Sequence, residues 1–284
     1  MTVPLAFSFD NTADYFIFAF HFLLATSTVT VAGSVVFAIL RTKSLRNENR
    51  YIFMLSTSIS DTLSGVGWYY IGLFDVKDTY PQKNGTYFVI PTLLGVNFIT
   101  ILTAQIDRYV AVSRPFFYAR RITRRVVIGL CTFIWMYTYL TVLLINLVPL
   151  QVAIIYQAIN SFGVQVVAVI LMILLNIKLY VIARYQLARE PPSQGTDSKR
   201  SSLRLIIAVA MCFLIFWTPE FINIILCGLT SYGYTFKNDA LDPFVAMVRI
   251  NPLCTPTLYI IGSLALREAI AKALRWNDCS RTRR

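Results

Sequence analysis

Seven long apolar segments follow one another along the chain, separated by short connections. Each has at least the ~20 residues that a helix needs to cross a hydrocarbon core about 30 Å thick. Backbone polar groups must be satisfied inside a bilayer, and a helix does this within one segment. The pattern therefore predicts an all-α, seven-transmembrane helix bundle with spans at about 15–40, 51–74, 87–112, 126–148, 157–186, 203–227 and 241–262.

The chain after the last span has the pattern of a surface helix. Apolar and basic residues alternate at helical spacing, which places Leu266, Ile270 and Leu274 on one face. A basic amphipathic helix lies along a membrane surface, so we expect a short eighth helix on the cytoplasmic side. The domains are then an extracellular amino terminus (1–14), a seven-transmembrane domain (15–262), and the amphipathic helix with a short cytoplasmic tail (263–284).

Composition agrees with a membrane protein. Only 14% of the 284 residues are charged and 56% are hydrophobic, whereas a soluble domain carries about 25% charged residues. The net charge of +12 suggests a nucleic-acid binder, but its distribution argues against one.

The basic residues are concentrated on one side of the predicted bundle. If the first residues lie outside, every Lys and Arg lies inside except Lys77, Lys83 and Lys237, which lie outside, and Arg249, which lies within a span. Cytoplasmic loops retain basic residues during insertion. The sequence therefore predicts a multi-pass plasma-membrane protein with its amino terminus outside and its carboxyl terminus in the cytoplasm, in contact with the lipid bilayer and with no nucleic acid.

An ionisable pair marks the inner end of the third span, in the triplet Asp107-Arg108-Tyr109. Charged residues at the edge of a membrane helix cost free energy and are by default functional hypotheses. Arginine keeps its charge at any accessible pH, so an ion pair with Asp107 is suited to hold Arg108 in an inactive conformation. A solvated ion pair at a helix end is the plainer alternative.

Further motifs occur in order, each on its own span. They are Gly33-Ser34-Val35-Val36, Leu55 to Asp61, Trp135, Tyr180, Phe213 with Phe216-Trp217-Thr218-Pro219, and Pro256-Thr257-Leu258-Tyr259. With the triplet they resemble the rhodopsin-like (class A) G-protein-coupled receptors, and the resemblance covers nearly the whole chain. It implies an orphan-type receptor that transduces an extracellular signal to a heterotrimeric G protein, and not an enzyme.

The resemblance also implies a set of switch residues. Arg108, once released from Asp107, is expected to meet an incoming partner helix and Tyr180. Prolines in mid-span remove backbone donors and kink helices, and such helices make two-state elements. The complete set implied for coupling and switching is Asp107, Arg108, Tyr109, Tyr180, Tyr259, Phe213, Trp217, Pro219 and Pro256.

A lone carboxylate, Asp61, lies near the middle of the second span. By analogy with the family, Asn97, Asn251 and Thr255 supply oxygens around it for a bound Na⁺, and no other cofactor is expected. The family has asparagine where this chain has Thr255. A protonated, hydrogen-bonded Asp61 without sodium remains the alternative.

Two charges fall near the level of the expected ligand pocket, Glu220 and Arg249. An unpaired charge there is expensive, so either they pair or one of them serves a ligand. We favour a Glu220–Arg249 pair. The second possibility is that Arg249 binds a ligand carboxylate or phosphate, and the third is that Arg249 pairs with Asp242. The ligand-binding residues that we expect are Ile90, Trp217, Glu220 and Arg249.

Departures from the family pattern constrain the ligand. Ile90 stands where amine receptors carry aspartate, and Arg249 stands where opsins carry the lysine that binds retinal. Met172 replaces the fifth-span proline, and the usual outer cysteine pair is missing. These features show a partial resemblance to the melanocortin, lipid and cannabinoid branch. We expect a small extracellular ligand that is lipid-like or anionic.

Two modification sites and several other functions stay open. Asn84-Gly85-Thr86 is a glycosylation sequon, and Cys279 is either palmitoylated or an unmodified thiol. A membrane transporter or channel is one alternative, although the chain shows no internal repeat. A membrane enzyme is another alternative, but His21 is the single histidine of the chain, so the sequence has no His-rich metal cluster. A non-signalling pseudoreceptor is another alternative, because Ser34 and Thr255 replace asparagines.

Overall fold

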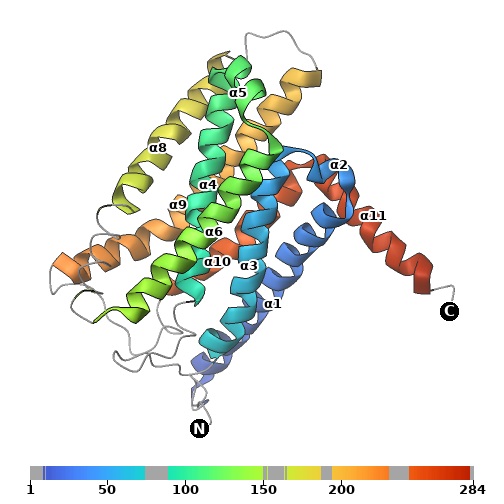
Figure 1. Ribbon diagram of the computed structural model, residues 1–284. Helices are drawn as coiled ribbons and strands as arrows, with labels where there is room; N and C mark the ends of the chain where they lie inside the picture. Colours follow the sequence, from blue (N-terminus) through green and yellow to red (C-terminus); the bar gives the residue numbers. More distant parts are fainter. Residues whose placement is uncertain are drawn as a thin grey trace.

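The computed structural model describes residues 11–73, 89–149, 165–186, 194–229 and 243–281, together with positions 9, 152 and 163. Its elements are helical (Figure 1): α1 (Thr12–Arg41), α2 (Lys43–Arg46), α3 (Asn49–Leu73), α4 (Val89–Ser113), α5 (Pro115–Arg121), α6 (Arg124–Leu147), α8 (Val166–Val181), the π-helix η2 (Ile182–Gln186), α9 (Gln194–Leu229), α10 (Pro243–Gly262) and α11 (Leu264–Arg281). The predicted all-α bundle is confirmed.

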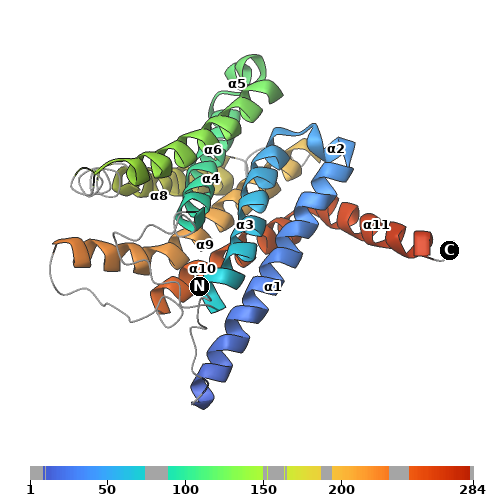
Figure 2. The same ribbon diagram turned by 60° about the horizontal axis from the view of Figure 1, so that its bottom comes forward.

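The helix α3 lies at the centre of the packing, since it contacts α1, α4, α6 and α10. Figures 1 and 2 show α1 beside α3 along the bundle. The two helices approach closely at Gly65, where an added Cβ would lie 2.8 Å from a methyl group of Val29. Small residues at helix crossings let backbones come together inside a membrane.

The outer surface of the bundle is apolar. Within the described residues, α1, α6, α8 with η2, α9 and α10 are long and apolar enough to cross a membrane. Large side chains on α6 that face away from the bundle include Phe133, Met136, Tyr139 and Leu140. A solvent-facing helix would not expose such a surface, so these side chains face lipid.

The polar side chains lie inside and join the helices. Ser60 of α3 donates to the Leu93 carbonyl of α4 at 2.7 Å. The Trp135 indole of α6 donates to Ser56 of α3 at 3.0 Å. Side-chain hydrogen bonds of this kind hold helices together where lipid offers no partner.

The last helix, α11, is fixed to the bundle at its first turn. Ser263 accepts a hydrogen bond from the Leu266 amide at 3.3 Å and shares another with the Tyr51 hydroxyl at 2.9 Å. Leu266 is fully buried, whereas the far end of α11 points away from the bundle in Figure 1. A Cβ on Gly262 would lie 2.6 Å from Leu205 Cδ1, so a larger residue here would require the Leu205 side chain to move.

The sixth span differs from its predicted limits. The helix α9 begins at Gln194, ahead of the predicted start at residue 203. The extension is polar, with Asp197, Lys199 and Arg200 among its residues. An apolar run predicts only the part of a helix that lies in lipid. It therefore could not predict that α9 extends beyond the lipid through polar residues.

Candidate functional site

The Asp107–Arg108 pair lies near the carboxyl-terminal end of α4, as the sequence indicated. Arg108 Nε donates to Asp107 Oδ2 at 2.9 Å, and Arg108 Nη2 contacts the same oxygen. The Asp107 side chain is 5% exposed and that of Arg108 20%. Charge-assisted hydrogen bonds are about twice as strong as neutral ones, so this partly buried pair holds the guanidinium firmly.

Tyr118 of α5 bonds both members of the pair, and this contact was not predicted from the sequence. Its hydroxyl accepts from Arg108 Nη2 at 3.1 Å and donates to Asp107 Oδ2 at 3.4 Å. Asn49 of α3 donates to the same hydroxyl at 3.3 Å. The sequence signal that could have predicted this contact is Pro115, because proline favours the first turn of a helix and so marks the start of α5. That helix carries Tyr118 back toward α4.

The Tyr118 hydroxyl keeps its proton at neutral pH. Burial raises the pKa of Tyr118 above its ordinary value of 10.0, although the positive charge of Arg108 and the hydrogen bond from Asn49 act in the opposite direction. The hydroxyl can therefore donate to Asp107 at any physiological pH. Together these contacts join α3, α4 and α5 around one guanidinium.

We expect Tyr118→Phe to raise ligand-independent guanine-nucleotide exchange several-fold. The change removes one hydroxyl that bonds both members of the ion pair, and a hydrogen bond to a charged group contributes about 1.5–3 kcal/mol. Exchange measured on receptor reconstituted with a heterotrimeric G protein checks this. Tyr185→Phe, at an exposed tyrosine of η2, is the matched control. An unchanged basal rate in Tyr118→Phe would contradict the assigned role.

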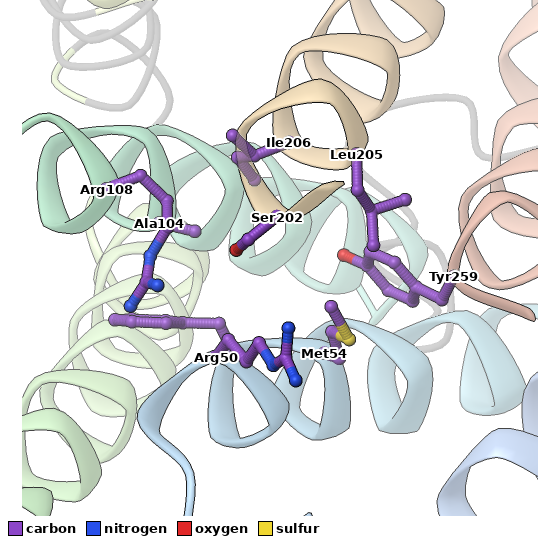
Figure 3. A pocket seen from close by; sticks show the side chains of 9 residues that line it. Arg50, Met54, Ala104, Arg108, Ser202, Leu205, Ile206 and Tyr259 are labelled. Atoms are coloured by element: carbon purple, nitrogen blue, oxygen red, sulfur yellow. The ribbon is translucent and has the colours of Figure 1, made fainter. Parts of the chain in front are cut away.

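A small cavity lies beside this network, between α3, α4, α9 and α10 (Figure 3). Its walls are formed by Arg50, Phe53, Met54, Ala104, Arg108, Ser202, Leu205, Ile206 and Tyr259. Tyr259 is buried and shares a hydrogen bond with Thr57 at 3.0 Å. Two of the expected switch residues, Arg108 and Tyr259, thus border one space.

Tyr180 does not reach this cavity. It is 52% exposed and lies on the outer surface of α8, which contradicts its predicted inward position. The face of α8 toward the bundle carries Met172, Asn176 and Leu179. One further residue along a helix turns a side chain by roughly 100°, so Tyr180 falls beyond that face. Tyr109, in contrast, is half-buried and packs near Leu179 and Ile182.

An aromatic stack crosses from α4 to α9 above the cavity. The Phe213 ring stacks on Phe98 with centroids 5.5 Å apart and on Trp217 at the same spacing. Phe213 and Trp217 therefore share an inward face. The helix α9 continues through Pro219 and α10 through Pro256; the kinks assigned to these prolines stay predictions.

Asp61 lies at the centre of the bundle and is 0% exposed. The Asn97 amide donates to its Oδ1 at 2.5 Å. Asn251 and Thr255 of α10 are also buried. Buried oxygens without a hydrogen-bond partner among the described residues include Asp61 Oδ2, Asn97 Oδ1, Asn251 Oδ1 and Thr255 Oγ1. Unpaired buried oxygens are costly, so this donor set fits a cation such as Na⁺.

Arg249 lies on α10 and is 1% exposed. Its Nη1 lies 3.2 Å from Nδ1 of His21 on α1, and its guanidinium covers the Trp68 ring of α3 at 4.6 Å from the centroid. The sequence had not indicated either contact. The pairing of Arg249 with Glu220, a half-buried residue of α9, stays a prediction.

Several predicted positions lie outside what the structure describes. Asp242 and Asn84 are not among the described residues, and the side chains of Ile90 and Cys279 are also undescribed. The predictions of ligand contact at Ile90, glycosylation at Asn84 and palmitoylation at Cys279 therefore remain predictions.

Comparison with known proteins places this arrangement in a family. Residues 32–259 match the family described as 7 transmembrane receptor (rhodopsin family). The zebrafish (Danio rerio) sphingosine 1-phosphate receptor 1 is 24% identical over 86% of this chain and 74% of its own length. Mouse (Mus musculus) G-protein coupled receptor 183 is 21% identical over 96% of this chain and 88% of its own length.

A third relative covers less of the chain. The sea lamprey (Petromyzon marinus) trace amine-associated receptor 365 is 28% identical over 63% of this chain and 56% of its own length. The family is one of receptors rather than of enzymes, and the match gives no support to a transporter or channel. With a match that spans most of its length, the chain belongs to the rhodopsin family of seven-transmembrane receptors and is a multi-pass G-protein-coupled receptor of the cell membrane.

Proposed function

We propose that this receptor signals by releasing Arg108 from Asp107 and Tyr118 into the cytosolic cavity, where a heterotrimeric G protein binds. The observation that carries the proposal is the position of Arg108, which is tethered on one side and lines the cavity on the other. A ligand that binds the released arrangement better shifts the population toward it. No bond is made or broken in this step.

The proposed orientation places the amino terminus outside the cell. The basic helices α2 and α5 lie toward one end of the bundle, and the start of α1 lies at the other (Figure 1). The cavity is lined by Arg108, near the end of α4 that leads into α5. Basic residues are retained on the cytoplasmic side. The end that carries Arg108 is therefore the cytoplasmic end.

We further propose a ligand that combines an apolar body with an anionic group. Arg249 supplies a buried cation in the outer half, next to a cluster of apolar residues that includes Ala25, Trp68 and Val248. The zebrafish relative is named for sphingosine 1-phosphate, a ligand with a phosphate. The lamprey relative is named for trace amines, but Ile90 of this chain offers no carboxylate to an amine.

Reconstitution tests the coupling and the ligand class together. Full-length receptor in nanodiscs is mixed with a heterotrimeric G protein, and nucleotide exchange is followed with neutral and anionic fractions of a lipid extract. We expect the anionic fraction to accelerate exchange and Arg108→Gln to abolish the acceleration. No exchange above empty nanodiscs with any fraction would reject coupling. A response to the neutral fraction alone would reject the ligand class.

We also propose that Asp61, Asn97, Asn251 and Thr255 hold a sodium ion. The support is the group of buried oxygens without hydrogen-bond partners among the described residues. A bound cation supplies positive charge to a carboxylate that is otherwise enclosed in the bundle. It would stabilise the arrangement in which α3, α4 and α10 are packed around Asp61.

We expect Asp61→Asn to remove the dependence of basal nucleotide exchange on sodium. In the unmodified receptor, replacing potassium with sodium should lower the basal rate and raise the melting temperature, because the ion binds one arrangement. Asn at this position keeps the size of the side chain and removes its charge. Asp14→Asn, at the start of α1, is the control. Equal responses to sodium in Asp61→Asn and the unmodified receptor would eliminate this site.

A further inference from the structure

The seam between α9 and α10 carries two free thiols, Cys212 on α9 and Cys254 on α10. The two side chains are hydrogen-bonding neighbours, and both are partly exposed. Cys131, the other free cysteine of the described residues, is buried on α6, where its hydrogen-bonding neighbour is Ser56. Cys212 and Cys254 are therefore the adjacent thiol pair in the described part of the chain.

The register of the two helices explains why these thiols meet. Gly262 of α10 packs directly against the Leu205 side chain of α9, and the two helices run in opposite directions along the bundle (Figure 1). Cys212 is seven residues after Leu205, and Cys254 is eight residues before Gly262. At 1.5 Å per residue, both cysteines lie about 11–12 Å from this crossing. Seven residues are also nearly two full turns, so Cys212 shares the face of Leu205.

The thiol pair lies on the lipid side of the seam. Met211 and Ile215, which flank Cys212 on α9, are 45% and 57% exposed. Both helices are long and apolar enough to cross a membrane, and Cys212 lies near the middle of the α9 span, Arg200–Asn223. A reagent that dissolves in the bilayer can therefore reach the two sulfur atoms.

Two neighbouring thiols can hold a metal ion or form a disulfide. Structural zinc sites use four ligands, and the described residues contain no group of three or more His, Cys, Asp or Glu side chains that could hold a metal. A disulfide needs only two sulfur atoms that can approach to about 2.05 Å. Rotation of side chains that already contact one another meets this need. The pair is therefore suited to oxidation rather than to metal binding.

We propose that Cys212 and Cys254 form a redox-sensitive site, in which a lipid-soluble hydroperoxide oxidises the two thiols to a disulfide that joins α9 to α10. In the first step one Sγ attacks the outer peroxide oxygen and the O–O bond breaks. A sulfenic acid forms, and the thiol proton passes to the leaving alkoxide to give an alcohol. In the second step the other Sγ attacks the sulfenic sulfur. The S–S bond forms, and the hydroxyl group leaves as water with the second thiol proton.

The disulfide is expected to hold the receptor in its resting arrangement. The thiols are neighbours in the arrangement in which Arg108 is tethered to Asp107 and Tyr118. A covalent bond between them stabilises this arrangement relative to any in which α9 moves away from α10, so the population shifts toward it. Oxidation should therefore lower nucleotide exchange. This consequence rests on the proposed coupling to a G protein, whereas formation of the disulfide does not.

The test uses the full-length receptor in nanodiscs, treated with cumene hydroperoxide and then denatured, alkylated and digested. We expect mass spectrometry to find Cys212 and Cys254 in one disulfide-linked peptide pair. Oxidation should lower basal nucleotide exchange several-fold, and a membrane-permeant dithiol should restore it. Cys212→Ser and Cys254→Ser should each keep their exchange rate after oxidation. Cys131→Ser, which removes a thiol outside the pair, should be cross-linked and inhibited like the unmodified receptor.

The outcomes separate this inference from the proposed function. Recovery of both cysteines as alkylated thiols, in a sample where added glutathione is fully oxidised, would overturn the site. Sulfinic or sulfonic acid in place of the disulfide would overturn it as well. An equal loss of exchange in Cys212→Ser would show that oxidation acts elsewhere. A disulfide without any change in exchange would overturn the restraint on α9, while coupling stands. Absence of exchange in the reduced receptor would overturn coupling, and mass spectrometry would still decide whether the disulfide forms.

Discussion

Replacing Asp107 with asparagine is expected to raise ligand-independent nucleotide exchange at least about tenfold. The variant keeps the shape of the side chain but removes the negative charge that Arg108 contacts through Nε and Nη2. Hydrogen bonds to charged groups contribute about 1.5–3 kcal/mol, and about 1.4 kcal/mol changes an equilibrium tenfold. The substitution destabilises only the arrangement in which Arg108 is bonded to residue 107, so the equilibrium shifts toward the arrangement in which Arg108 is released.

The measurement is exchange on reconstituted receptor without ligand, normalised to the amount of folded protein. Asp107→Asn combined with Tyr118→Phe should raise the basal rate by less than the product of the single effects, because both groups contact one guanidinium. Asp107→Asn with Arg108→Gln should return the rate to background. A basal rate in Asp107→Asn equal to that of the unmodified receptor would show that the ion pair does not restrain signalling.

The helical bundle and the main switch residues were predictable because their signals are local. A membrane span needs an apolar run of fixed length, and the triplet at Arg108 lies at the end of such a run. The packing of Phe213 on Trp217 follows from helical spacing alone. These inferences need no knowledge of which helices are neighbours.

The missed residues depend on contacts between distant parts of the chain. Tyr118 reaches Arg108 because α5 turns back on α4, and His21 reaches Arg249 across the bundle from α1. Arg50 resembles any basic loop residue until the cavity places it beside Arg108. Tyr180 was misplaced because one residue along a helix separates an inward face from a lipid-facing one.

Arg249→Ala is expected to lower the potency of an anionic ligand at least about tenfold after correction for surface level. Arg249 is 1% exposed and lies over the Trp68 ring, where a desolvated cation–π contact contributes about 2 kcal/mol. Alanine also removes the cation that we assign to the ligand's anionic group. Part of the protein should therefore fail to reach the surface, and the part that does should respond weakly.

Arg249→Lys and Glu220→Gln distinguish the possible roles of this cation. Lysine keeps the charge but not the planar group that covers Trp68, so it should retain part of the response if the ligand needs a cation. If Arg249 instead serves mainly as the partner of Glu220, then Glu220→Gln should lower the surface level as much as Arg249→Ala does. Surface expression and dose–response curves measure both effects. Should Arg249→Ala leave surface level and response unchanged, Arg249 neither binds the ligand nor stabilises the outer half of the bundle.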